Sequence, residues 1–312
     1  MSPSEQDVVE QSEAVLRTHA RSFRWAAPFL PQDARRDAAV TYAFCRLVDD
    51  VVDERDDDDE SRRELDVIER ELDGRALPRP LVAAYREIEA RRAIPREAAI
   101  ELLAGMRMDL GEVRLRDDDE LDLYCFRVAG TVGLMMAPIL GARDPRAFLH
   151  AVDLGIGMQL TNICRDVAED AGRGRVYLPA DRLVAEGASQ AGVLDGSAPD
   201  DAVLRVLRAL LDKADALYSS GREGLAFLPL RARLGVAVAA RLYRAIGLRV
   251  HALGARALRE RAVVSPPRKL GHVAVAFWDA LSTPTPSPKA LPPASSGAAD
   301  PARRSYIFGS VE

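Results

Sequence analysis

Two segments of the chain each carry a pair of aspartates four residues apart, Asp49 with Asp53 and Asp166 with Asp170. Residues at this spacing share one face of a helix, so the two carboxylates of each pair point in the same direction. Like charges placed in this way oppose helix formation by about 0.2–0.5 kcal/mol per pair. Burial beside the apolar neighbours of both pairs adds a further cost unless a cation compensates for it. The spacing therefore predicts a bound cation at the aspartates.

The oxygen ligands of these aspartates favour Mg²⁺, with Mn²⁺ as the alternative, because Mg²⁺ keeps several waters and commonly bridges carboxylates to substrate phosphates. A diphosphate is the natural partner of such a site. Gln159 and Asn162 precede Asp166 on the same helical face, at steps of three and four, and can orient the diphosphate or metal-bound water. Arg46 and Arg165 stand beside the aspartates and can bind phosphate oxygens.

The remaining acidic, sulfur and imidazole side chains favour structural roles. Residues 56–59 are acids that point around the whole of a helix, which indicates a solvated face, and residues 117–119 indicate the cap of a helix start. The histidines lie far apart with no ligand spacing, so a zinc site is not expected. Buried free thiols are expected at Cys45, Cys125 and Cys164.

The composition excludes several classes of protein. With 312 residues, 48% of them apolar, the chain can bury a sizeable core, and its net charge of −5 lacks the basic excess of a nucleic-acid-binding protein. The opening residues MSPSEQDVVEQSE lack the cationic start and apolar run of a signal peptide. No apolar stretch approaches the roughly 20 residues that span a bilayer. We therefore expect a cytoplasmic protein without a nucleic-acid partner.

The hydrophobic pattern predicts an all-α fold. Apolar residues recur at helical spacing between Pro, Gly and Ser or Asp, and alternating Val, Ile and Thr runs are absent. Ser4 and Asp7 resemble a capping box at the first helix. Helices are expected at residues 4–26, 33–53, 62–72, 80–91, 95–110, 120–140 and 145–171, and from about residues 200, 229 and 266 onward.

The composition changes near residue 281. From there the chain reads Thr-Pro-Thr-Pro-Ser-Pro and then Pro-Pro-Ala-Ser-Ser-Gly, which cannot pack a core. We expect one catalytic domain over residues 1–280 and a disordered Pro/Ser/Ala-rich tail over residues 281–312.

Four stretches of the chain resemble successive signatures of the squalene/phytoene synthase family. They read TYAFCRLVDDVVDE, YCFRVAGTVG, GIGMQLTNICRDVAEDAGRGRVYLP and VVSPPRKL, in the family's order, and the resemblance extends over nearly the whole catalytic body. It implies an all-α isoprenoid-synthase helical bundle with a central hydrophobic cavity. The two aspartate motifs would face each other across that cavity.

The resemblance also implies roles for individual residues. The metal ligands would be Asp49, Asp53, Asn162, Asp166 and Asp170, and the polar mouth would be lined by Arg46, Gln159, Asn162 and Arg165. The residues matching tyrosines near the diphosphates are Tyr42, Tyr124 and Tyr177. Later contacts would come from Tyr243 and Arg261, and the hydrocarbon channel would be bordered by Phe23, Val128, Ala129 and Gly130.

The chemistry that the resemblance implies fits these side chains. Ionisation of an allylic diphosphate needs metal and Arg to stabilise the leaving charge, and apolar walls to keep water from the carbocation. Two prenyl diphosphates would join head to head into a cyclopropyl diphosphate. A second ionisation, rearrangement and proton loss would give phytoene, whereas hydride delivery from NADPH would give squalene. The hydrocarbon product leads us to expect peripheral contact with the inner membrane face.

The choice of substrate depends on the depth of the channel. Ala27 and Ala39 are small and would leave room for C20 geranylgeranyl tails, although both could equally pack helices. We therefore expect phytoene from geranylgeranyl diphosphate. The alternatives are a squalene, dehydrosqualene or presqualene diphosphate synthase that uses farnesyl diphosphate, and an inactive helical assembly factor of the same fold. The lack of a glycine-rich NADPH fingerprint favours the non-reductive product.

Overall fold

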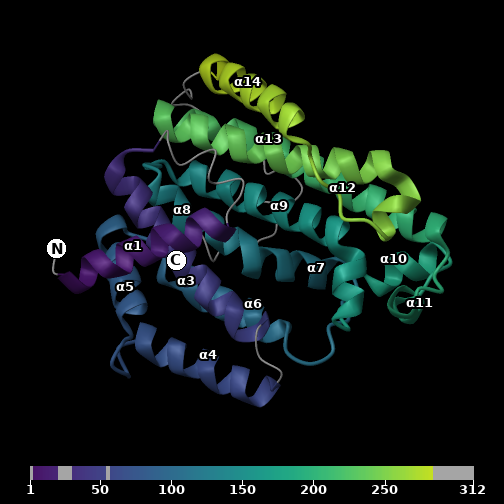
Figure 1. Cartoon of the computed structure of the whole chain (residues 1–312), viewed down its shortest axis with the longest axis horizontal. Coiled ribbons are helices and arrows are strands. Elements are labelled where there is room, and N and C mark those ends of the chain that lie inside the picture. Colours follow the sequence, from purple (N-terminus) through teal and green to yellow (C-terminus); the bar gives the residue numbers. More distant parts are fainter. Residues whose placement is uncertain (1–2, 20–29, 54–56, 284–312) are drawn as a thin grey trace, which may run out of the picture.

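The computed structural model describes residues 3–19, 30–53 and 57–283 (Figure 1). Within these ranges the chain forms helices and one isolated bridge between Arg114 and Val176, with no strand, so the predicted all-α fold is confirmed. The elements are α1 (Pro3–His19), α3 (Gln32–Asp53), α4 (Asp58–Leu72), α5 (Pro80–Arg92), α6 (Arg96–Met108), α7 (Asp118–Cys125), η2 (Phe126–Gly130), α8 (Thr131–Ile139), α9 (Pro145–Gly172), α10 (Ala180–Ala185), α11 (Gln190–Asp195), α12 (Asp200–Gly224), η3 (Leu225–Phe227), α13 (Leu230–Leu253), η4 (Gly254–Leu258) and α14 (Pro266–Ser282).

The long helix α9 runs through the middle of the bundle (Figure 1). It packs against α12 and α13 on one side and against α8 and η2 on the other, while α14 covers the outer side of α13. Its start is fixed by Pro145 at the first turn and by Asp144, whose side chain accepts a hydrogen bond of 2.9 Å from the backbone N–H of Arg146. A helix with neighbours on both sides can present residues from its whole length to an internal cavity.

Two glycines allow α9 to approach η2 and α8 backbone to backbone. A Cβ at Gly155 of α9 would lie 2.3 Å from the carbonyl oxygen of Ala129, and a Cβ at Gly133 of α8 would lie 2.2 Å from that of Ala151. No side chain fits at such distances, so only glycine permits this contact.

The expected helix over residues 120–140 is divided into three parts. After α7, residues Phe126–Gly130 form a π-helical turn, and α8 begins only at Thr131. π-Helical turns inside α-helices are rare and occur frequently at functional sites. This turn carries Val128 and Ala129, both predicted to border the hydrocarbon channel.

Capping aspartates begin two of the helices. The side chain of Asp57 accepts hydrogen bonds from the backbone N–H groups of Asp59 and Glu60, so the exposed acidic run starts α4 four residues before its expected beginning. The side chain of Asp117 accepts from the backbone N–H of Glu120 and caps α7, as predicted.

Other expectations from the sequence meet different outcomes. The three cysteines are free thiols; Cys125 and Cys164 are buried, as expected, whereas Cys45 is only half-buried. The side chain of Ser4, where a capping box is predicted, is not among the described side chains. The part of the first expected helix beyond residue 19 lies outside the described residues. Helix α14 ends at Ser282, two residues past the expected boundary of the catalytic domain. Among the described residues, no helix is long and apolar enough to cross a membrane.

Candidate active site

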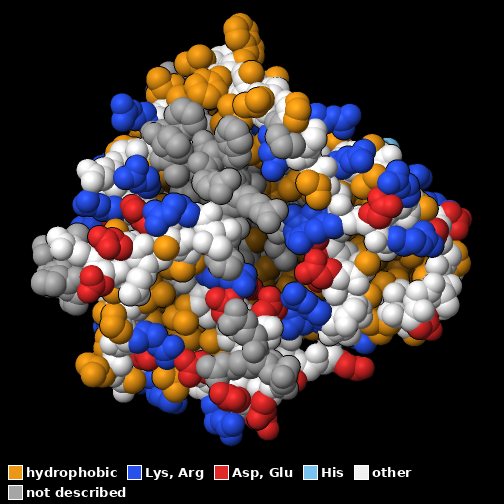
Figure 2. Space-filling model, in the orientation of Figure 1, with side chains coloured by type: hydrophobic (Ala, Val, Ile, Leu, Met, Phe, Trp, Pro, Cys, Tyr) orange, Lys and Arg blue, Asp and Glu red, His pale blue; other side chains and the backbone are white. Residues whose placement is uncertain are grey.

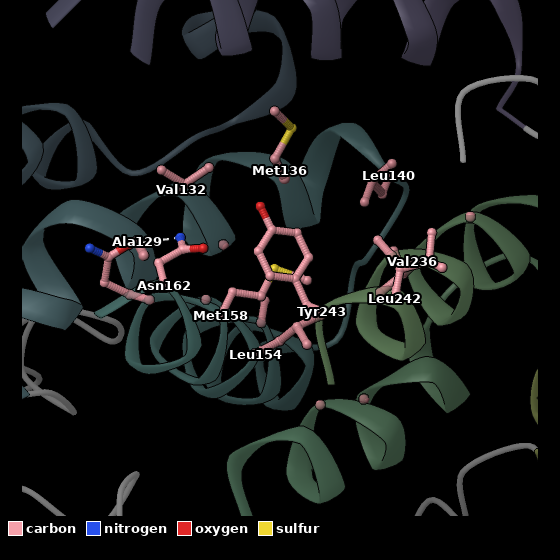
Figure 3. Close-up of a pocket in the computed structure, with 18 of the residues that line it drawn as sticks. Ala129, Val132, Met136, Leu140, Leu154, Met158, Asn162, Val236, Leu242 and Tyr243 are labelled. Carbon is pink, nitrogen blue, oxygen red and sulfur yellow. Dashed lines mark hydrogen bonds between the residues drawn. The ribbon is translucent and has the colours of Figure 1, made fainter. Parts of the chain in front are cut away.

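A cavity of about 720 Å³ lies inside the bundle, between α3, η2, α8, α9, α12 and α13. Its polar end is formed by six of the predicted site residues, Tyr42, Gln159, Asn162, Arg165, Tyr243 and Arg261. Its walls are apolar and include Val128, Ala129, Val132, Met136, Leu154, Met158 and Leu242. In Figure 3, Tyr243 projects between Met136 of α8 and the α9 residues Leu154 and Met158. The cavity therefore joins a hydrogen-bonding end to a hydrocarbon-like interior.

Near the apolar walls of the cavity, the imidazole of His150 belongs to a buried hydrogen-bond network. Its Nδ1 lies 2.9 Å from Oγ of Ser220, and the Ser220 hydroxyl donates to Asp153 at 2.5 Å. Because that hydroxyl already donates to a carboxylate, it accepts from Nδ1–H of His150. The network ties Nδ1 of His150, which lines the cavity, to Ser220 and Asp153, which do not.

At the polar end, Asn162 presents an amide oxygen that has no protein partner. Its Nδ2 donates to Oε1 of Gln159 at 3.3 Å, and the Oδ1 atom is buried without a hydrogen bond among the described residues. A buried acceptor left without a donor carries a desolvation cost. This oxygen is therefore suited to a metal ion or to a water on that ion.

The first aspartate pair is held by arginines from two elements. Nη1 of Arg46 bonds Oδ2 of Asp49 at 2.7 Å, and Nη1 of Arg175 bonds Oδ1 of Asp53 at 2.9 Å. Burial and then the charge of Asp53 raise the pKa of Asp49 to about 6, although Arg46 opposes the shift. The two carboxylates thus repel each other in a partly dehydrated place, as the sequence predicted from their spacing.

The second aspartate pair lies where α9 departs from helical geometry. Asp166 has φ −108° and ψ 15°, so α9 bends there. Arg165 bonds Asp166 through Nε at 2.8 Å, and Nε of Arg261 reaches the same carboxylate at 3.1 Å. Burial, together with the charges of Asp166 and Glu169, raises the pKa of Asp170 to about 7.

The loop after α9 connects the two aspartate pairs. Arg173 and Arg175 bond Asp53 at 3.4 and 2.9 Å, and the charges of the same two arginines lower the pKa of Asp170. The backbone N–H of Arg175 also donates to the carbonyl of Asp170 at 2.9 Å. Both pairs therefore lie around one cationic loop. Arg175 was not singled out from the sequence, although it stands in the GRGRVYLP stretch quoted above.

Asp109 is a buried acid that the sequence did not reveal. The hydroxyl of Tyr177 donates to its Oδ1 at 2.7 Å and that of Tyr124 to its Oδ2 at 3.0 Å, and the two rings stack with centroids 4.7 Å apart. Burial raises the pKa of Asp109 to about 6, although Tyr177 opposes the shift, and the charge of Asp109 raises that of Asp49. The predicted residues Tyr124 and Tyr177 therefore lie beside the first aspartate pair rather than in the cavity wall.

Four predicted channel residues do not line the cavity or cannot be placed. Gly130 is buried, and a Cβ there would lie 3.0 Å from the ring of Phe126. Ala39 is fully buried within the packing of α3 and is absent from the cavity wall. Phe23 and Ala27 lie outside the described residues. The two alanines that suggested a C20 channel thus give no information about its depth.

The polar end fits a divalent ion that is shared with a ligand. In the described part of the chain, no three His, Cys, Asp or Glu side chains could hold an ion by themselves. Mg²⁺ does not require such a cage, because it is usually bound through one or two carboxylates, waters and substrate phosphates. The half-buried carboxylates of Asp49 and Asp170 supply oxygen donors of this kind, as does the amide oxygen of Asn162, which has no hydrogen bond among the described residues.

Comparison with known proteins agrees with this fold and site. The family model described as squalene/phytoene synthase matches residues 16–268 of the chain. The chain therefore belongs to the squalene/phytoene synthase family. The metal-dependent condensation of prenyl diphosphates is the general chemistry of this family.

The chain is also similar to individual proteins of this family. The chain is 37% identical to a 15-cis-phytoene synthase of Paracoccus sp. over 292 residues, which cover 90% of this chain and 94% of that one. It is 36% identical to a 15-cis-phytoene synthase of Enterobacter agglomerans, covering 86% of this chain and 94% of that one. Among solved structures, a dehydrosqualene synthase in complex with a ligand matches with a TM-score of 0.77 at 26% identity, covering 87% of this chain and 96% of that one.

Proposed function

We propose that this protein condenses two molecules of geranylgeranyl diphosphate head to head, through a cyclopropyl (prephytoene) diphosphate, into phytoene, in carotenoid biosynthesis. The observation that carries this proposal is a cavity in which an end with arginine and amide groups, Arg165 and Arg261 being paired with Asp166, continues into an apolar interior. The 15-cis-phytoene synthases named above, each matched over most of its length, support the product.

The length of the cavity supports the C20 substrate. Ala147 and Asn162 both line it from α9, and the fifteen helical steps that separate them span about 22 Å. An extended chain advances about 1.2 Å per bond, so a geranylgeranyl tail measures about 19 Å and a farnesyl tail about 14 Å. A farnesyl tail would leave apolar surface at the far end uncovered, which makes the longer tail the better fit.

We assign the binding of Mg²⁺, with Mn²⁺ as the alternative, to Asp49, Asp53, Asn162, Asp166 and Asp170. A bound ion would stabilise the negative charge of the departing diphosphate. The arginines beside the carboxylates can donate paired hydrogen bonds to phosphate oxygens, which orients the diphosphate at the polar end. This role belongs to Arg46, Arg165 and Arg261, and we add Arg175 from the loop after α9.

The residues of the walls protect the cation that ionisation leaves behind. Val128, Ala129 and Val132 offer no nucleophile, and the faces of aromatic side chains such as Tyr42 and Tyr243 are negative and attract a cation. Exclusion of water prevents premature capture of the carbocation. The cyclopropane ring forms with loss of one diphosphate and one proton. The second diphosphate then leaves, and the rearranged cation loses a second proton. We assign no proton acceptor among the side chains.

The second candidate is a synthase that uses farnesyl diphosphate to make squalene, dehydrosqualene or presqualene diphosphate. The structural likeness to a dehydrosqualene synthase favours it. NADPH would be required only for squalene. An inactive assembly factor of the same fold is the non-enzymatic candidate. The partly buried carboxylates of the two aspartate pairs argue against it, because they destabilise the fold when no ligand is bound.

The proposal is tested with purified protein, Mg²⁺ and no NADPH, supplied with equal amounts of labelled geranylgeranyl and farnesyl diphosphate. We expect phytoene as the main product. In the same assay, D166N should lower turnover by roughly a hundredfold or more because one carboxylate charge at the polar end is lost. The D212N variant, at an exposed position of α12, is the matched control and should keep full activity.

A preference for farnesyl diphosphate would replace the proposed substrate with the second candidate. Full activity in D166N would remove this carboxylate from the mechanism. Absence of any product from the unaltered protein would favour the assembly factor.

We also propose peripheral contact with the inner membrane face, in a protein that otherwise resides in the cytoplasm. The support is chemical, since both the prenyl tails and the C40 product partition into lipid.

A further inference from the structure

Helix α14 carries apolar side chains on the side that faces away from the protein. Its outer residues Leu270, Val275, Trp278 and Leu281 are exposed by 59, 43, 73 and 64%, and Val263 just before the helix is exposed by 66%. Figure 2 shows hydrophobic side chains gathered over the part of the molecule that α14 occupies in Figure 1. We call these five residues the α14 patch.

The patch is not the face with which α14 packs on the protein. Ala276 and Ala280 are fully buried and form a small core with Val238 and Leu242 of α13 and with Leu225. A surface helix normally has one apolar side toward the core and one polar side toward water. Because α14 is apolar on both sides, its outer side fits a second apolar environment.

Cations concentrate around the patch. Residues 261–283 contain three Arg or Lys and one acid, Asp279, whereas the whole chain has a net charge of −5. Asp279 is bonded by Arg241, which leaves Arg268 and Lys269 without an ion-pair partner in the described part of the chain. The pKa of His272 is lowered by burial and then by the charges of Arg241, Arg244 and Arg268. An apolar strip beside unpaired cations is complementary to an anionic lipid surface.

The cavity reaches the same part of the molecule. Val263, Val264 and Lys269 belong to its lining, and Val263 is also a member of the patch. Apolar surface therefore continues from the cavity wall to the outer side of α14. A hydrocarbon that leaves along this surface would remain in contact with apolar side chains throughout.

We propose that the α14 patch docks on an anionic lipid bilayer and that the cavity opens toward this bilayer beside Val263. Trp278 and Leu281 enter the boundary between headgroups and acyl chains, and Arg268 binds lipid phosphates. The helix lies in the interface, as amphipathic helices without a spanning segment do. Docking itself does not depend on the reaction, but the direction of product release rests on the proposed function.

The test is co-sedimentation of the full-length protein with vesicles of phosphatidylcholine, with and without phosphatidylglycerol. We expect binding to the anionic vesicles, and W278D/L281D should weaken it about tenfold or more because both apolar side chains are lost from the interface. The matched control is L77D, at a residue exposed by 93% that lies on the loop between α4 and α5, and it should bind like the unaltered protein. R268E should weaken binding to anionic vesicles about fivefold or more and leave binding to neutral vesicles unchanged.

Activity measured in detergent micelles separates this proposal from the proposed function. W278D/L281D should keep its turnover there, because neither Trp278 nor Leu281 lines the cavity. The docking proposal is overturned if the unaltered protein does not bind anionic vesicles, or if W278D/L281D binds them equally well. It is also overturned if the double substitution dissociates an oligomer without changing vesicle binding, because the patch would then be the contact with a second copy.

Discussion

Asp109 is a buried carboxyl group that influences the first aspartate pair through its hydrogen bonds and its charge. It accepts hydrogen bonds from Tyr124 and Tyr177, and its charge acts on Asp49 of the first aspartate pair. It does not line the cavity. We therefore regard Asp109 as a positioning residue that fixes the two tyrosine rings beside the aspartates.

Asp109 should make the stability of the metal-free protein depend on pH. Burial raises its pKa from 3.8 to about 6, so the folded chain keeps this proton to a higher pH than the unfolded chain. The protonated Asp109 therefore contributes its full stabilisation of the folded chain below pH 4, and this contribution is lost as the pH rises through 6. Between pH 4 and 7 the free energy of unfolding should fall by on the order of 2–3 kcal/mol through this group. Urea unfolding in the presence of a chelator measures the fall.

The matched variant for this prediction is D109N, which keeps the shape of the side chain but cannot titrate. Its stability should fall less steeply over the same pH range, while the slope contributed by other buried acids, such as Asp49 and Asp170, remains. Parallel curves for the two proteins would show that Asp109 has an ordinary pKa in the folded chain.

Single residues could be predicted from the sequence where they recur in a pattern. The two aspartate pairs, with Gln159, Asn162 and the flanking arginines, stand out because their spacing repeats a helical turn. Asp109 could not be found in this way, since it is a lone acid after an apolar helix and its tyrosine partners are distant in sequence. Only the fold brings them together.

At the scale of elements, the contact between α9 and the π-helical turn governs the shape of the cavity. Gly155 of α9 lies against the backbone of Ala129, and the neighbouring residues Val128 and Ala129 line the cavity wall. The absence of a side chain at Gly155 therefore sets how closely the turn can approach α9.

The substitution G155A should separate these two elements. The added Cβ would meet the carbonyl oxygen of Ala129 at 2.3 Å, so the backbones must move apart, at a cost of about 1–3 kcal/mol. Thermal unfolding should show a lower Tm, and the displaced cavity wall should reduce turnover. The control G271A, in α14, places its Cβ where no atom lies within 4 Å, and it should leave Tm unchanged or slightly higher. Equal Tm values for G155A and the unaltered protein would contradict the close contact.

Most helices could be predicted because their ends carry local signals. Pro145, Pro266 and the cap Asp117 mark helix starts within a turn of the observed ones. Neither the π-helical turn nor the bend at Asp166 contains a proline, so the sequence gives no local sign of them. Both depend on packing between elements that are distant along the chain.

For the whole molecule, the predicted boundary near residue 280 stays a proposal. Helix α14 completes its packing on α13 through Ala280, and Nη1 of Arg233 bonds the carbonyl of Thr283 at 3.1 Å. A chain that ends after Thr283 keeps all of these contacts. We propose that the catalytic domain needs nothing beyond this residue.

This proposal predicts that removal of residues 284–312 leaves turnover and Tm essentially unchanged. Circular dichroism melting and the product assay measure both quantities in the shortened and full-length chains. A matched chain that ends before Pro266 and so lacks α14 should have a lower Tm, because the buried side of α14 is lost from α13. A large loss of activity in the first chain would extend the functional domain into the tail.

The fold class and the polar half of the site could be anticipated, whereas the apolar half could be anticipated only at Val128 and Ala129. Helical periodicity and the family signatures predict a bundle that brings Tyr42, Asn162 and Arg165 together at one cavity end. The apolar walls come from ordinary core residues such as Met136 and Leu154, which no spacing distinguishes from other buried residues. Their role depends on the space that the packed helices leave between them.

The ion pairs at the polar end imply that the two kinds of ligand assist each other. Arg46, Arg165 and Arg175 already hold the carboxylates of Asp49, Asp166 and Asp53. A diphosphate that recruits these guanidinium groups frees the carboxylates for a cation, and a cation that takes the carboxylates frees the guanidinium groups for the anion. Each ligand thereby lowers the free-energy cost of binding the other, so the affinities for the cation and the diphosphate should rise together.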